Sequence, residues 1–178
     1  MPRMTTSLTK HTAFWPAALA IVIGDYASKR VAEAALALHV PREVMGDWVR
    51  FTLTYNTGAA MNVSLGGFSR VGLSLVAVAM IGVLVRLYRA AAPTDAWQAL
   101  ALGLVCGGAV GNLLDRLRSA RGVVDFIDVG TASWRFWTFN VADAGVTVGA
   151  LLLAAIYWRR PAEAPVADGA SAPVDLAE

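Results

Sequence analysis

Four apolar segments restrict what this sequence can fold into. The first begins near Ala13 and runs to its first acidic residue at Asp25, and the others cover about residues 71–87, 96–114 and 141–158. About 20 helical residues, at 1.5 Å each, cross a hydrocarbon core of about 30 Å, and flanking residues help the shorter segments. We therefore predict four transmembrane helices.

The composition agrees with an integral membrane protein. Hydrophobic residues make up 57% of the chain, charged residues 16%, and the mean hydropathy is +0.54, outside the balance of a soluble domain. Residues 1–160 are predicted to form a single membrane domain, and residues 161–178, rich in Ala, Pro and acid, a disordered cytoplasmic tail. The net charge of +2 is small and the basic residues are scattered, so we expect no nucleic-acid partner.

Glycine spacing predicts how one helix packs. Gly103, Gly107 and Gly111 recur every four residues along the third apolar segment, so one face of that helix has no side chains. A neighbouring helix can then approach closely. This face is interpreted as a packing surface rather than a ligand site.

The positive charges do not decide how the helices are oriented. If both termini are cytoplasmic, six of the fifteen Lys and Arg residues lie inside and nine outside. The rule depends mainly on short loops and helix flanks, where Arg86 with Arg89 and Arg159 with Arg160 favour a cytoplasmic location. Four helices would in any case put both termini on one side.

A short segment between the first two helices has a different pattern. From Val49 to Tyr55 apolar and polar residues alternate, which is typical of a half-buried strand, and the turn signal Asn56-Thr57-Gly58 follows. The predicted fold is therefore an all-α membrane protein with a small interfacial β-strand cradle between helices 1 and 2. A plain extracellular hairpin is the alternative.

Polar and ionisable residues gather in the second half of this apolar chain. A carboxylate at bilayer depth costs about 2.5 to 3.5 kcal/mol even on the lenient insertion scale, so such groups need partners and usually line a site or a water-filled cavity. The group comprises Asn112, Asp115, Arg116, Asp125, Asn140 and Asp143.

Three of these residues end the third segment. Asn112 and Arg116 are four residues apart and share a helical face, where an amide beside a guanidinium suits peptide carbonyls or a lipid phosphate. Asp115 points differently from Arg116. For Asp115 alone we favour a structural role, in which its carboxylate ties down a neighbouring loop.

Two aspartates have contrasting surroundings. With Asn140 as the N-cap of the fourth helix, Asp143 is its N3 residue and complements the helix dipole. Asp125, eighteen residues earlier, is placed across a loop, and its apolar neighbours are expected to raise its pKa. Such a pair can share one proton and divide the acid and base roles. Asp128 has similar neighbours and is the rival to Asp125.

These motifs, taken in order, resemble those of the lipoprotein signal peptidases, also called signal peptidase II. The resemblance runs from Asp25 through Asn56-Thr57-Gly58-Ala59-Ala60, GGAVGNLLDR and VVDFID to FNVAD, and covers nearly all of the chain outside its ends. It implies an inner-membrane aspartyl endopeptidase that cuts the signal peptide from a prolipoprotein just before a diacylglyceryl-modified cysteine. One departure is that Met61 and Asn62 stand where the family usually continues with Phe.

The resemblance also implies roles for individual residues. The catalytic pair is Asp125 and Asp143, the substrate-contacting residues are Asn56, Asn112, Arg116 and Asn140, and the supporting residues are Asp25, Lys29 and Asp115. No metal and no cofactor are implied. We expect a monomer in the bacterial inner membrane, with both termini cytoplasmic and the active site towards the outer face.

Two other functions remain open from the residues alone. Buried acids and Gly-interrupted helices also occur in small proton- or cation-coupled transporters, although no internal repeat is visible here. Asp125 and Asp128, at i and i+3, can share Mg²⁺ in an enzyme acting on lipid phosphates. A serine–histidine hydrolase is not favoured, because His11 and His39 lie away from these motifs and no GxSxG occurs.

Overall fold

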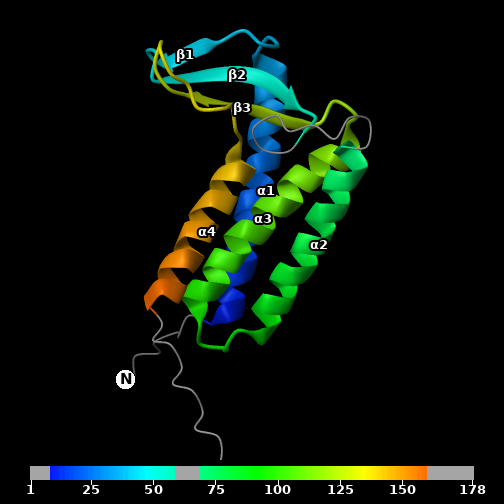
Figure 1. Cartoon of the computed structure of the whole chain (residues 1–178), viewed down its shortest axis with the longest axis vertical. Helices are drawn as coiled ribbons and strands as arrows, with labels where there is room; N and C mark the ends of the chain where they lie inside the picture. The colour runs from blue at the N-terminus through cyan, green and yellow to red at the C-terminus, as the bar shows by residue number, and fades with distance from the viewer. Residues whose placement is uncertain (1–8, 59–68, 160–178) are drawn as a thin grey trace, which may run out of the picture.

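The computed structural model describes residues 9–58 and 69–159, which form four helices and one small sheet across one end of the bundle (Figure 1). The helices are α1 (Lys10–Ala35), α2 (Ser69–Ala90), α3 (Ala96–Arg118) and α4 (Val141–Arg159), and the strands are β1 (Arg42–Met45), β2 (Val49–Asn56) and β3 (Val123–Val129). Met61, Asn62 and the tail predicted for residues 161–178 lie outside the described residues.

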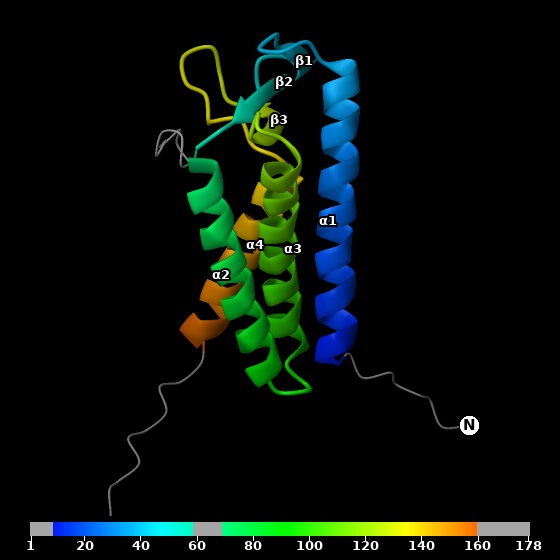
Figure 2. The same ribbon diagram turned by 90° about the vertical axis from the view of Figure 1, so that its right-hand side faces the viewer.

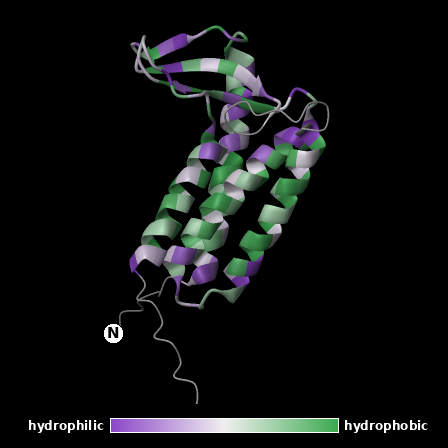
Figure 3. Ribbon diagram, viewed as in Figure 1, coloured by the Kyte–Doolittle hydropathy of each residue, from purple (hydrophilic) through white to green (hydrophobic). Residues whose placement is uncertain are grey.

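Three of the described helices are long and apolar enough to cross a membrane. These are α2 from Arg70 onwards, α3 and α4. Figure 3 shows their hydrophobic residues along the middle of the bundle and hydrophilic ones towards its ends and in the sheet. α1 does not reach the same apolar character, because Asp25 and Lys29 interrupt its apolar run and further charges follow.

α3 lies in the middle of the bundle and contacts the other three helices (Figures 1 and 2). A Cβ atom added at Gly103 would lie 2.5 Å from the carbonyl oxygen of Phe14, and one at Gly107 would lie 2.7 Å from that of Ala18. The backbones of α1 and α3 therefore meet directly. The predicted glycine packing face is confirmed, and its partner is α1.

One cluster of buried apolar side chains packs where α1, α2 and α3 meet, away from the sheet. The ring of Phe14 stacks on that of Tyr88 at 4.1 Å between centroids, and Leu102 is buried beside them. Lys10 donates a 2.8 Å hydrogen bond to the carbonyl of Ala91, just past the end of α2. These contacts hold the first turn of α1 against the end of α2.

The sheet is antiparallel, with strand order β1-β2-β3. The strand predicted over Val49–Tyr55 is confirmed as β2. The sequence analysis assigned no strand around Asp125, but Val123–Val129 forms β3, in which Asp125 pairs with Thr54 of β2. The connection between α3 and α4 thus completes a cradle that begins between α1 and α2, and the first turn of α1 and the last turn of α4 lie at the opposite end of the bundle (Figure 1).

Candidate active site

The carboxyl group of Asp125, in β3, is buried and its pKa is raised. It is only 3% exposed, and its Oδ1 accepts a 2.7 Å hydrogen bond from the Asn140 amide while its Oδ2 accepts one of 3.2 Å from the Asn56 amide. Burial, followed by the negative charge of Asp143, raises the pKa of Asp125 to about 7. The expected rise in its pKa is therefore found.

Asp143 lies in the first turn of α4 and is held by two donors. Its Oδ2 accepts from the backbone N–H of Asn140 at 3.2 Å, while the backbone N–H of Asp143 donates to Asn140 Oδ1 at 2.9 Å. This reciprocal pair is the capping arrangement predicted from the spacing. The amide of Asn112 donates a further hydrogen bond of 2.8 Å to Asp143 Oδ1.

Asn112 and Asn140 connect the two aspartates. The Asn140 amide, besides contacting Asp125, donates to Asn112 Oδ1 at 3.1 Å. Lys29 donates to the same oxygen at 3.0 Å. An ammonium group can only donate, so the Asn112 oxygen must face Lys29 and its amide nitrogen must face Asp143.

A buried ion cluster supports this arrangement from α1. Nζ of Lys29 lies 2.7 Å from a carboxylate oxygen of Asp25 and 2.8 Å from one of Asp115. Asp25 accepts from the backbone N–H of Ala142 at 2.9 Å, and Asp115 from that of Val124 at 3.2 Å. The two carboxylates therefore tie the start of α4 and the strand β3 to α1, with the charges paired as burial requires.

The predicted substrate-contacting residues do not all reach the same space. Asn56, Asn112 and Arg116 line one cavity of about 230 Å³ together with Asp125 and Asp143. Arg116 is oriented there by hydrogen bonds to the carbonyls of Asn112 at 3.2 Å and Gly58 at 3.5 Å. Asn140 is completely buried behind the cavity wall, so its geometry suits positioning of Asp125 rather than contact with a substrate.

Further cavity residues escaped the sequence analysis. They are Val123, Trp137, Thr138, Val146 and Thr147. Thr138 shares a 2.9 Å hydrogen bond with Thr54, which attaches the segment before α4 to β2. The aromatic character of this segment was the only available signal, and it indicates a membrane interface rather than a cavity wall.

Asp128 lies apart from the cavity, although it is only three residues from Asp125. Successive side chains of a strand point to opposite faces, so positions i and i+3 diverge. Its carboxylate pairs with Arg135 at 2.6 Å and accepts from Thr52 at 3.1 Å, and it shares neither partner with Asp125. This geometry disfavours Asp128 as the replacement for Asp125 in the pair with Asp143. It also disfavours a metal ion shared by Asp125 and Asp128.

Comparisons of the sequence with known proteins agree on one family. The sequence profile described as Signal peptidase (SPase) II matches residues 17–159. A lipoprotein signal peptidase of Pseudomonas syringae pv. tomato is 41% identical over 152 residues, covering 84% of this chain and 87% of the relative. One from Pseudomonas fluorescens strain Pf-5 is also 41% identical, over 143 residues, covering 79% and 83%. A solved structure described as a bacterial membrane enzyme at 2.3 Å resolution superposes with a TM-score of 0.74 at 25% identity, covering 84% of this chain and 92% of the other.

Proposed function

Because this chain belongs to the signal peptidase II family of proteases, we propose that it removes signal peptides from prolipoproteins by means of Asp125 and Asp143. The scissile bond is the one before a diacylglyceryl-modified cysteine. The observation that carries this proposal is that the two carboxyl groups, from β3 and α4, line one cavity and are bridged by the amides of Asn112 and Asn140.

The two aspartates divide the chemistry. Asp125, with a pKa of about 7, holds a proton. Asp143, ionised, draws a proton from a water molecule between the pair, and the water oxygen attacks the scissile carbonyl while Asp125 donates its proton to the developing oxyanion. Collapse of the tetrahedral intermediate breaks the C–N bond: Asp143 passes its proton to the leaving amine, and one hydroxyl of the intermediate returns a proton to Asp125. No metal ion or cofactor takes part.

Three side chains of the cavity hold the peptide near the dyad. Arg116 offers a guanidinium to peptide carbonyls, and Asn56 and Asn112 bring amides to the same wall. Correct placement of the scissile bond accounts for a large part of such a rate enhancement. Asn140, Asp25, Lys29 and Asp115 act one step further away, by holding the catalytic carboxyls and the elements that carry them.

We propose four membrane spans, including α1. Its 26 residues reach about 39 Å. Its buried Asp25 and Lys29 pair with each other, so the bilayer does not meet them as isolated charges. Both termini are assigned to the cytoplasm of a bacterial inner membrane, because Arg86, Arg89 and Arg159 flank helices at the end away from the sheet. The dyad then faces the outer side of the membrane. We propose that the enzyme works as a monomer.

The deciding experiment is cleavage of a lipidated precursor by the purified full-length protein. We expect release of the signal peptide, in excess chelator as well, and little turnover of the same precursor without its diacylglyceryl group. Two acyl chains dominate recognition of a short apolar peptide, since each buried methylene contributes about 0.8 kcal/mol. Equal rates on the two precursors would contradict lipid-dependent recognition.

Two further measurements test the two alternative functions. Loss of activity with EDTA that Mg²⁺ restores would favour the metal-dependent lipid-phosphate enzyme. Proton flux into liposomes that contain only the protein would favour a transporter. Neither is expected, because the two acids line a cavity at the sheet end of the bundle and Asp128 faces away from it.

A further inference from the structure

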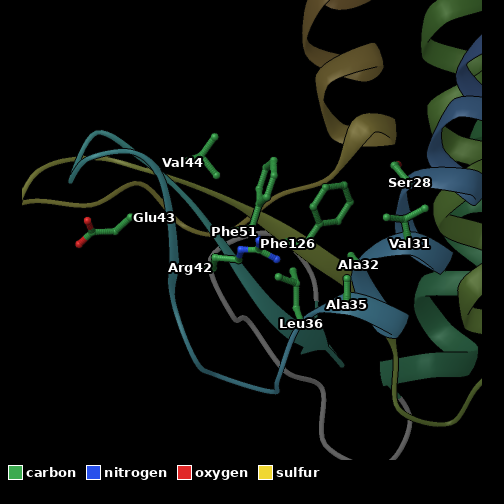
Figure 4. Close-up of a pocket in the computed structure, with 10 residues that line it drawn as sticks. All are labelled: Ser28, Val31, Ala32, Ala35, Leu36, Arg42, Glu43, Val44, Phe51 and Phe126. Atoms are coloured by element: carbon green, nitrogen blue, oxygen red, sulfur yellow. The ribbon is translucent and has the colours of Figure 1, made fainter.

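A second and larger cavity lies on the other side of the sheet. It is an open groove of about 690 Å³ between the sheet end of α1 and the cradle (Figure 4). Its lining comprises Ser28, Val31, Ala32, Ala35, Leu36, Arg42, Glu43, Val44, Phe51 and Phe126. None of these residues lines the dyad cavity. Asp125 and Phe126 are neighbours in β3, so their side chains face opposite sides of the sheet.

The walls of this groove are suited to an aliphatic chain. Val31, Phe51 and Phe126 present apolar surface from three different elements. The hydroxyl of Ser28 is already used, since it donates to the carbonyl of Asp25 at 3.0 Å. The volume lies within the range of about 300–1,000 Å³ typical of small-molecule sites, and such sites are lined mainly by apolar side chains.

One cation stands at the groove. Arg42 pairs with Phe51 across β1 and β2. Among the residues that the structure describes, none of the ion pairs involves Arg42. In Figure 4 the side chain of Glu43 extends away from the groove, whereas that of Arg42 lies beside Phe51. The groove therefore joins an apolar channel to a positive charge that can accept an anionic group.

The surroundings of the groove are suited to the bilayer boundary. The hairpin between β1 and β2 exposes apolar side chains at its tip, with Met45 68% and Trp48 67% exposed. Val31, in the α1 wall, is 66% exposed. An exposed Trp beside apolar residues is typical of the headgroup level of a membrane. A molecule entering this groove from the bilayer would place its acyl chain among Val31, Phe51 and Phe126 and its headgroup near Arg42.

We propose that this groove binds one acyl chain of a resident glycerophospholipid, whose phosphate pairs with Arg42. Apolar walls with a single available guanidinium match a molecule that is aliphatic at one end and anionic at the other. The site lies across the sheet from Asp125, so its occupant is a lipid of the bilayer and not the acyl chains of the substrate. The bound lipid would hold the cradle at the membrane surface.

The test is photo-cross-linking, with no substrate present. Full-length protein carrying Asp125→Asn is reconstituted in phosphatidylglycerol–phosphatidylethanolamine vesicles that contain a trace of phosphatidylglycerol with a diazirine on one acyl chain. We expect labelling of peptides containing Val31 or Phe126 above that of the lipid-facing residue Val76 of α2. Ala35→Trp fills the groove and should reduce this labelling to the α2 level, whereas Ala34→Trp, on the neighbouring exposed position, should leave it unchanged.

A second pair of variants tests the headgroup contact. Arg42→Gln should lower labelling by the phospholipid probe but not by a diazirine diacylglycerol without a phosphate, and Arg86→Gln, exposed on α2, should change neither. Groove labelling no higher than that of α2 would overturn the proposal. So would displacement of the probe by a lipidated precursor, which would make the substrate the occupant. These readings do not use turnover, so they stand or fall separately from the proposed peptidase activity.

Discussion

Nζ of Lys29 lies 3.0 Å from the side-chain oxygen of Asn112, and this contact decides which way the Asn112 amide faces. The amide nitrogen is thereby turned to Asp143, to which it donates at 2.8 Å. In the part of the chain that the structure describes, the hydrogen bonds of Lys29 go to Asn112, Asp25 and Asp115 rather than to the proposed dyad, yet Lys29 orients a donor to one dyad member. The ion cluster of Asp25, Lys29 and Asp115 and the cavity that holds the proposed dyad are thus one connected network.

Replacing either aspartate of the proposed dyad with asparagine should abolish cleavage. Asp125→Asn and Asp143→Asn keep the side-chain volume, but an amide cannot exchange the required proton. Each single variant should therefore lose nearly as much activity as the double variant, because the two residues act as a unit. The measurement is signal-peptide release per folded molecule, with circular dichroism to verify folding. Substantial turnover by either variant would remove that residue from the dyad.

The matched control for this experiment is Asp128→Asn, in the same strand. Asp128 pairs with Arg135 and Thr52 rather than with the cavity, so the variant should retain turnover per folded molecule even if it melts earlier. A loss of turnover as complete as that of Asp125→Asn would mean that cleavage needs Asp128 as much as it needs Asp125.

The pH dependence should report the carboxyl group of Asp125. Its pKa is raised from 3.8 to about 7, and the proposed mechanism needs its protonated form, so kcat/KM should fall as the pH rises through about 7. The same raised pKa makes the stability of the fold depend on pH. The folded state holds this proton more tightly than the unfolded state, so the free energy of unfolding decreases between pH 3.8 and about 7, by up to about 1.4 kcal/mol per pH unit.

Asp125→Asn removes this penalty because an amide does not ionise. Its melting temperature relative to the unmodified protein should therefore rise from pH 4 to pH 8, measured by thermal unfolding in detergent. A constant difference across that range would show that Asp125 does not change its protonation on unfolding.

Asp115 should matter more to stability than to chemistry. Asp115→Ala leaves Lys29 with one carboxylate fewer and the buried N–H of Val124 without its acceptor, at a cost of about 3 kcal/mol. Its melting temperature should fall below that of Asp125→Asn under the same conditions. An unchanged melting temperature with reduced turnover would place Asp115 with the catalytic residues instead.

The contact between α1 and α3 can be tested with a pair of glycines. Gly103→Ala places a methyl group 2.5 Å from the backbone carbonyl of Phe14, so the helices must separate and the melting temperature should fall. Gly82→Ala, on α2 with nothing within 4 Å of the added atom, should be neutral or stabilising by up to about 1 kcal/mol. Equal effects of the two substitutions would mean that α1 and α3 do not meet through this face.

Features that depend on neighbours along the chain were predictable from the sequence. Apolar runs predicted the helices, and the alternation from Val49 to Tyr55 predicted β2. The three-residue spacing of Asn140 and Asp143 predicted their positions at the start of α4, where the structure has them exchange hydrogen bonds. The repeat of Gly103 and Gly107 likewise predicted close packing of α3, because four residues return to one helical face.

Features that depend on distant segments were decided only by the tertiary structure. Asp125 and Asp128 have similar sequence neighbours. They differ because β3 pairs with β2, which places their side chains on opposite faces of the sheet. Lys29 reaches Asn112 across 83 residues of sequence, through helices whose side-chain registers no local pattern relates. The lipid groove between α1 and the sheet has the same origin. A local pattern records which face of an element is apolar, but the partner of that face is chosen by packing of the whole chain.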